Sequence, residues 1–96
     1  MAIDLGDPAS YLVLEEGADV YASDGEKVGA VAEIRADLVN DIFDGLVVRH
    51  GPLGHGHFVE AEQVDEIYER GVVLALTAHD VEGLPEPDEL PRLAPG

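Results

Sequence analysis

Apolar and polar residues alternate along residues 17–37, and this alternation predicts two β-strands joined by a tight turn. Aspartate and glycine at Asp24-Gly25 tolerate the positive φ angles that hairpin turns require. Each predicted strand carries its apolar residues on one parity, as expected of a strand with one buried face. The buried parity holds Ala18, Val20 and Ala22 in the first strand and Val28, Ala30, Ala32 and Ile34 in the second, where only Val31 breaks the alternation.

Shorter elements are predicted on both sides of this hairpin. Asp7-Pro8 suits the start of a helical turn, and the apolar run at 11–14 suits a strand or an extended segment. Residues 38–45 are turn-rich and predict a connection that carries some apolar side chains. Strands are then expected at 46–49, from Phe58 onwards and at 72–77, with an apolar segment at 64–68, a turn at 69–71 and a glycine-rich loop at 50–56.

The predicted strand at 72–77 is apolar on both faces. Its two alternating sets are Val72, Leu74 and Leu76 on one side and Val73, Ala75 and Thr77 on the other. Such a strand is expected at the centre of a sheet, or with its outer face covered by another element or another subunit.

One short helix is predicted after this strand, and a tail after the helix. Thr77 and Asp80 have the spacing of a capping box, and Gly83 followed by Pro85 provides the stop. Four of the six prolines lie in residues 85–96, which predicts an extended or disordered tail. We therefore expect a flexible N-terminus at 1–10, one domain at 11–85 and a proline-rich acidic tail at 86–96.

A series of five to six short strands followed by one helix predicts an all-β fold, and a small barrel of antiparallel strands is favoured over a sandwich. The chain resembles the PRC-barrel family over roughly residues 11–85. The resemblance rests on GADVY at 17–21, DGEKVG at 24–29, IFDGLVV at 42–48, VDEI at 64–67, and GVVLAL at 71–76 leading into DVEGLP at 80–85. It implies a small PRC-type β-barrel with a C-terminal helix that acts through protein contacts. Glu60 departs from the family, which commonly has proline after the valine there.

The charge balance excludes several partners. Five Lys and Arg residues stand against 21 Asp and Glu, for a formal net charge of -16. Nucleic acid and anionic membranes would be repelled, and the cations are spaced too widely along the sequence to predict a basic patch. The acidity fits either solubility, including a salt-rich cytoplasm, or a basic protein partner. The chain has no cysteine, no signal-peptide pattern and no long apolar run, so a cytoplasmic protein is expected.

Three histidines provide the sharpest local feature. His50, His55 and His57 fall within eight residues, on or beside the glycine-rich loop. Zinc, nickel or copper accept imidazole ligands, and a carboxylate such as Glu60 could complete the set. A solvated loop without a ligand and a pH-responsive loop are the alternatives. His79, at the start of the predicted helix, is expected to be a surface residue.

No pattern specifies a reaction. Carboxylate pairs are expected by chance at this acidity, no phosphate-binding or nucleophile-elbow motif is present, and no cofactor is expected. The sequence therefore favours a non-enzymatic protein-interaction module that self-associates as a homodimer and binds an unidentified protein partner. The candidate contact residues are Val73 and Ala75 on the outer face of the 72–77 strand, and Leu90 and Leu93 in the tail. A metal- or pH-responsive module using His50, His55 and His57 is the alternative.

Overall fold

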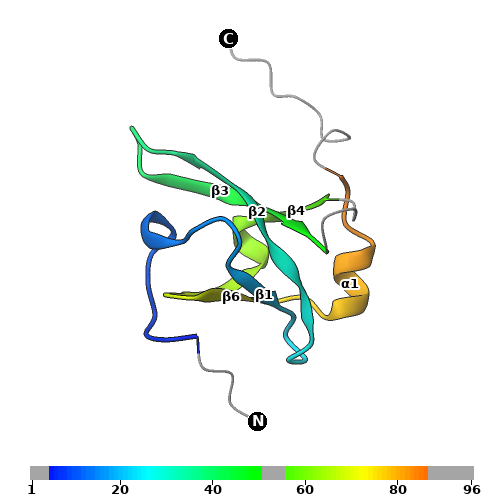
Figure 1. Ribbon diagram of the computed structural model, residues 1–96. Coiled ribbons are helices and arrows are strands. Elements are labelled where there is room, and N and C mark those ends of the chain that lie inside the picture. The colour runs from blue at the N-terminus through cyan, green and yellow to red at the C-terminus, as the bar shows by residue number, and fades with distance from the viewer. Residues whose placement is uncertain (1–4, 51–55, 87–96) are drawn as a thin grey trace.

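A computed structural model describes residues 5–50 and 56–86, and in this part of the chain six strands form one mixed sheet (Figure 1). The strands are β1 (Asp19–Tyr21), β2 (Lys27–Asp37), β3 (Ile42–Arg49), β4 (Gly56–Glu60), β5 (Val64–Tyr68) and β6 (Gly71–Leu74). Their order is β4-β3-β2-β1-β6-β5. Two 3-10 helices, η1 (Tyr11–Val13) and η2 (Ala61–Gln63), and one α-helix, α1 (Ala78–Glu82), complete the described elements.

The predicted all-β class with one short helix is confirmed, but the antiparallel barrel is not. β1 pairs with β6 in parallel, and the outermost strands β4 and β5 do not pair with each other. The chain passes from β4 to β5 through η2, a 3-10 turn that redirects it, instead of through a hairpin turn that would pair them. Six strands therefore make an open sheet.

Both outer strands of this open sheet are covered by the protein's own chain. Along β5 runs the N-terminal segment, where Pro8 bridges Tyr68 and the amide of Ala9 donates to the carbonyl of Ile67 at 2.8 Å. On the other edge, the Phe58 amide of β4 donates to the Pro85 carbonyl at 2.9 Å. Covered edges cannot easily recruit a strand from another chain.

The N-terminal prediction is corrected by these contacts. Asp7-Pro8 does not begin a helical turn, because Pro8 lies in the extended bridge to β5. The turn forms instead at η1, where the run at 11–14 was expected to be extended. Ser10 caps it, its Oγ accepting a hydrogen bond from the Leu12 amide at 3.2 Å.

The hairpin of β1 and β2 is confirmed, including its turn, and two of the three residues expected to be buried in its first strand are buried, whereas Ala18 is only half-buried. Gly25 has φ +87°, and Val20 and Ala22 are buried. The second strand differs from its alternation, because Val31 is buried whereas Ala30 and Ala32 are only half-buried. A register shift lies between Val31 and Glu33, and such bulges change which face the following residues occupy.

One cluster of buried apolar side chains lies between the sheet and the elements that cover it. Its members are Leu14, Val20, Val31, Leu46, Val48, Val59, Val72, Leu74 and Val81. Val81 brings α1 into this core. The predicted capping box holds the start of that helix, since Thr77 Oγ1 accepts from the Asp80 amide at 3.2 Å and Asp80 Oδ2 accepts from the Thr77 amide at 3.3 Å. Gly83 is the C-cap.

The longest pairing in the sheet joins β2 and β3. Ile42 pairs with Asp37, so β3 begins four residues before the predicted strand at 46–49. The connection between the two strands is correspondingly short. In Figure 1 this hairpin projects beyond the remaining strands, with η1 beside it.

Candidate interaction surface

Large apolar side chains are exposed at one place in the described residues, on η1 and at the end of the β2–β3 hairpin. We call this the hairpin surface, and its members are Leu12, Val13, Leu38, Val39 and Ile42. Val39 is 93% exposed and Leu38 is 72% exposed. Single exposed apolar residues are common on protein surfaces, whereas a group of them indicates a contact site.

The two parts of the hairpin surface are held together by Tyr11. Its ring stacks on Phe43 with a centroid distance of 5.2 Å and an interplanar angle of 14°. Its hydroxyl donates a hydrogen bond to Asp41 Oδ1 at 2.5 Å. This hydrogen bond to a carboxylate raises the pKa of Tyr11, because the neutral phenol is the form that can donate. η1 is thereby fixed against the hairpin.

Between η1 and the hairpin lies an apolar groove of about 300 Å³. Leu12 and Leu38 of the hairpin surface line it, which shows that the two parts adjoin. The remaining lining residues are Tyr11, Leu14, Ile34 and Ala36. The groove has the chemistry to accept an apolar side chain from another molecule.

The tip of the hairpin is ordered by its own polar groups. Asp37 Oδ1 accepts from the amides of Val39 and Asn40, at 3.1 and 3.2 Å, and Asp37 Oδ2 accepts from Asn40 Nδ2 at 2.7 Å. The Asn40 side-chain bond is the largest of the causes that lower the pKa of Asp37. Asp41 takes the left-handed conformation with φ +54°, which aspartate tolerates better than most residues. Asp37, Asp41 and Asp44 make this end of the protein acidic as well as apolar.

The contact residues expected from sequence lie elsewhere. Val73 is half-buried in β6, whereas Ala75 is exposed and lies beyond this strand, which ends at Leu74 and not at the predicted residue 77. Leu90 and Leu93 fall outside the described residues. β6 does have the predicted central position, between β1 and β5. Leu5 covers part of its outer face, since a Cβ built on Gly71 would lie 2.8 Å from Leu5 Cδ2. β6 is apolar on both faces, and Leu5 of the same chain accounts for part of the cover on its outer face.

Sequence reasoning missed the hairpin surface. Residues 38–45 were expected to form a connection with apolar side chains, and residues 11–14 a strand or extended segment, so neither was expected to expose a joint surface. One signal was available in the sequence, because Leu38, Val39 and Ile42 are adjacent to polar turn residues. These are Asp37, Asn40, Asp41 and Asp44. Leu38 and Val39 lie in the connection and have no strand face to bury them, and Ile42 is the first residue of β3.

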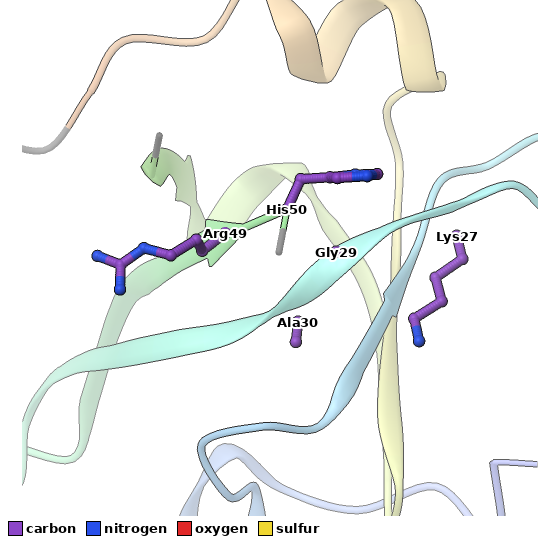
Figure 2. A pocket seen from close by; sticks show the side chains of 5 residues that line it. All are labelled: Lys27, Gly29, Ala30, Arg49 and His50. Carbon is purple, nitrogen blue, oxygen red and sulfur yellow. The ribbon is translucent and has the colours of Figure 1, made fainter. Parts of the chain in front are cut away.

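Two cations lie closer together than their sequence spacing indicated. Lys27 and Arg49 line one cavity of about 420 Å³ together with His50. Figure 2 shows their side chains extending in different directions around Gly29 and Ala30. Lys27 Nζ binds Asp19 Oδ1 at 3.0 Å, which neutralises one of the two charges. The cavity is thus no concentrated basic patch.

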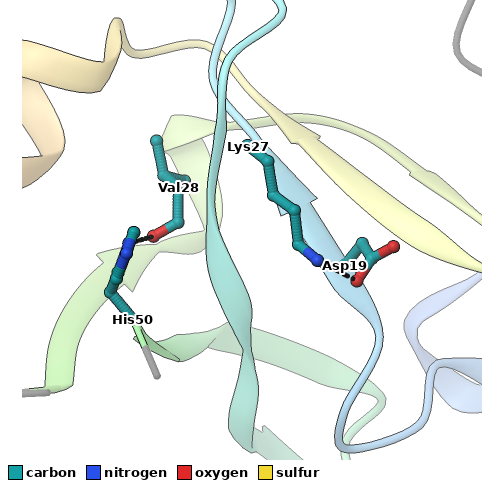
Figure 3. A network of polar contacts seen from close by, with 4 residues as sticks. All are labelled: Asp19, Lys27, Val28 and His50. Carbon is teal, nitrogen blue, oxygen red and sulfur yellow. Dashed lines mark hydrogen bonds and ion pairs between the residues drawn. The ribbon is translucent and has the colours of Figure 1, made fainter.

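Two of the three clustered histidines lie in the described residues, and His55 lies outside them. His50 follows β3 and His57 belongs to β4; both line a second cavity, of about 300 Å³. His50 Nδ1 lies 3.3 Å from the Val28 carbonyl oxygen (Figure 3), and His57 Nδ1 lies 3.1 Å from that of Leu84. Within residues 5–50 and 56–86, no three His, Cys, Asp or Glu side chains are grouped closely enough to hold a metal ion as they stand. Glu60, the expected carboxylate ligand, does not line this cavity and takes part in the cap of η2.

The chain matches the model of a family described as uncharacterized protein conserved in bacteria (DUF2171) over residues 14–82, and it belongs to that family. The resemblance to the PRC-barrel family is therefore wrong. It depended on turns and core patterns, such as the Asp24-Gly25 turn, that different small β-folds share, and the sheet is not closed into a barrel. No curated protein matches the chain. None of the described helices is long and apolar enough to cross a membrane.

Proposed function

We propose that this member of the DUF2171 family is a non-enzymatic protein-interaction module that acts in the cytoplasm and binds its partner through the hairpin surface. The observation that carries the proposal is the joint exposure of Leu12, Val13, Leu38, Val39 and Ile42 beside an apolar groove. Leaving this surface in water is unfavourable by roughly 25 cal/mol for each Å² of apolar area. A partner that covers it removes that cost.

The chemistry of the hairpin surface favours a partner segment that is both apolar and basic. Asp37, Asp41 and Asp44 stand at the hairpin end, and the whole chain carries a formal charge of -16. Arg35 is the cation of β2 nearest this end, and it is engaged by Glu33 at 3.1 Å and by the ring of Phe58 at 5.6 Å. Lysine or arginine residues flanking apolar side chains would therefore complement the surface and accelerate association.

Self-association remains a prediction. Two copies would have to bring together two strongly acidic chains, and the contacts along the outer strands β4 and β5 disfavour strand pairing there. The homodimer expected through Val73 and Ala75 would instead use the outer face of β6 and the residue that follows the strand. Sedimentation velocity of the parent and of an Ala75→Asp variant tests it, and an unchanged sedimentation coefficient in the variant would contradict that interface.

The partner proposal can be tested with a defined peptide. The probe is a synthetic helical peptide with leucine along one face and lysine along the other, titrated by calorimetry. We expect saturable one-to-one binding to the parent and at least tenfold weaker binding to Val39→Asp, because a charge would be buried against apolar side chains. Ala75→Asp is the matched control, since it adds the same charge at an exposed position outside the hairpin surface.

The added charge makes the outcome decisive. If lysine attraction alone drives binding, both aspartate variants should bind the peptide slightly more tightly than the parent. If the apolar surface drives it, only Val39→Asp should weaken binding. Equal affinities of the two variants, or a greater loss in Ala75→Asp, would refute the assignment of the hairpin surface.

A further inference from the structure

His50 and His57 line one cavity, although only His57 belongs to a strand. His57 of β4 pairs directly with Val48 of β3, and His50 follows Val48 by two residues. Gly56 pairs with Arg49, the last residue of β3, so His57 of β4 lies close to the point where the chain leaves β3 at His50. The two imidazoles therefore line one cavity, as noted above.

Both imidazoles are oriented by backbone carbonyl groups. A carbonyl oxygen can only accept a hydrogen bond, so each Nδ1 must be the protonated nitrogen that donates, at 3.3 Å from His50 to Val28 and at 3.1 Å from His57 to Leu84. In the neutral ring, Nε2 then carries the free lone pair. This is the outer-shell arrangement typical of histidines that ligate a metal through Nε2.

The charges around the cavity favour a cation. Glu26 and Glu82 line it together with the two histidines, and both carboxylates are exposed. Lys27 also lines it, but Figure 3 shows its side chain running to Asp19, away from the His50 ring. In Figure 2 the Arg49 side chain extends away from His50. The net charge of -16 adds a long-range attraction for cations.

We propose that His50 and His57 bind one divalent transition-metal ion of the zinc or nickel class through their Nε2 atoms, with the Glu82 carboxylate as third ligand. As the side chains stand, no three ligands meet, so Glu82 must change its rotamer. Glu82 is exposed, so this change costs mainly side-chain entropy. Glu82 precedes by two residues the Leu84 carbonyl that orients His57, and water would occupy the remaining position. The inference is independent of the hairpin surface.

Metal titration of the complete protein tests the site. Zinc chloride and nickel chloride are added to metal-free protein, and binding is followed by native mass spectrometry and calorimetry. We expect one ion per chain, and at least tenfold weaker binding in His50→Ala and in His57→Ala. Glu82→Gln should weaken binding less, and Glu26→Gln should leave it within twofold of the parent.

His79 supplies the matched control, because it is an exposed histidine on α1 that does not line the cavity. His79→Ala should bind the ion as the parent does. If His57→Ala fails to fold by circular dichroism, the exposed His50 decides the question alone. Nitrogen NMR shifts should identify Nε2 as the coordinated atom in both rings. No one-to-one binding at micromolar metal, or an equal loss in His79→Ala, would overturn the proposal.

Discussion

Replacing Gly45 with alanine should destabilise the protein far more than the same replacement at Gly25. Both glycines have positive φ angles, +156° at Gly45 and +87° at Gly25. They differ in their surroundings. A Cβ on Gly45 would lie 2.3 Å from the Val59 carbonyl oxygen, whereas a Cβ on Gly25 would have nothing within 4 Å.

The size of the difference follows from these two terms. Alanine at Gly25 pays only the conformational penalty, roughly 1–2 kcal/mol. Alanine at Gly45 costs about 1–3 kcal/mol because of its backbone conformation. It costs about 1–3 kcal/mol more because the added Cβ clashes with the backbone of the neighbouring strand, which must move. Gly45→Ala should therefore lower the free energy of unfolding by about 4 kcal/mol, a large part of the roughly 5–15 kcal/mol typical of a domain.

Urea denaturation and thermal melting of both variants provide the measurement. For a domain of this size, 1 kcal/mol corresponds to about 4–8 °C in Tm. The Tm of Gly45→Ala should accordingly lie at least about 10 °C below that of Gly25→Ala. Equal losses in the two variants would show that β4 does not lie against Gly45 in the described register, and the pairing of β3 with β4 would have to be revised.

Two further predictions concern pH. The raised pKa of Tyr11 means that its hydrogen bond to Asp41 stabilises the fold fully below the usual tyrosine pKa of 10.0, and this stabilisation is lost as pH rises through the raised pKa. Tyr11→Phe keeps the ring and should remove that part of the loss, seen as a flatter urea-denaturation profile above about pH 10. The lowered pKa of Asp37 means that its stabilisation is present above 3.8 and is lost as pH falls through the lowered value. Asn40→Ala should weaken this acid dependence in melts below about pH 4, and parallel profiles would contradict it.

Features set by neighbouring residues were predictable from the sequence. The Asp24-Gly25 turn and the Thr77–Asp80 capping box each depend on fewer than ten consecutive residues, and both form as expected. The parallel pairing of β1 with β6 joins segments about 50 residues apart, and no local pattern marks it. The prediction that Val31 lies on the exposed face was wrong for a related reason. A bulge shifts the alternation of buried and exposed residues and leaves no clear trace in the sequence.

The candidate sites show the same division. The three histidines were visible as a cluster, but the carbonyl groups that orient two of them belong to Val28 and Leu84, far away in the chain. The hairpin surface depends on Tyr11 reaching across to Phe43 and Asp41. The polar turn around Leu38 and Val39 indicates that these side chains are exposed, but nothing in the sequence indicates that η1 lies beside them.

The hairpin surface and the histidine cavity lie at opposite ends of β3, and this separation makes the two proposals testable apart. β3 has eight residues between the hairpin tip and the end near α1 (Figure 1). At about 3.3 Å per residue, its ends are roughly 23 Å apart. The Debye length at physiological ionic strength is only about 8 Å, so the charge of a bound ion would be largely screened at the hairpin surface. Peptide affinity should thus be the same with and without zinc; a change would require the β2–β3 hairpin itself to adopt two arrangements that both ligands bias.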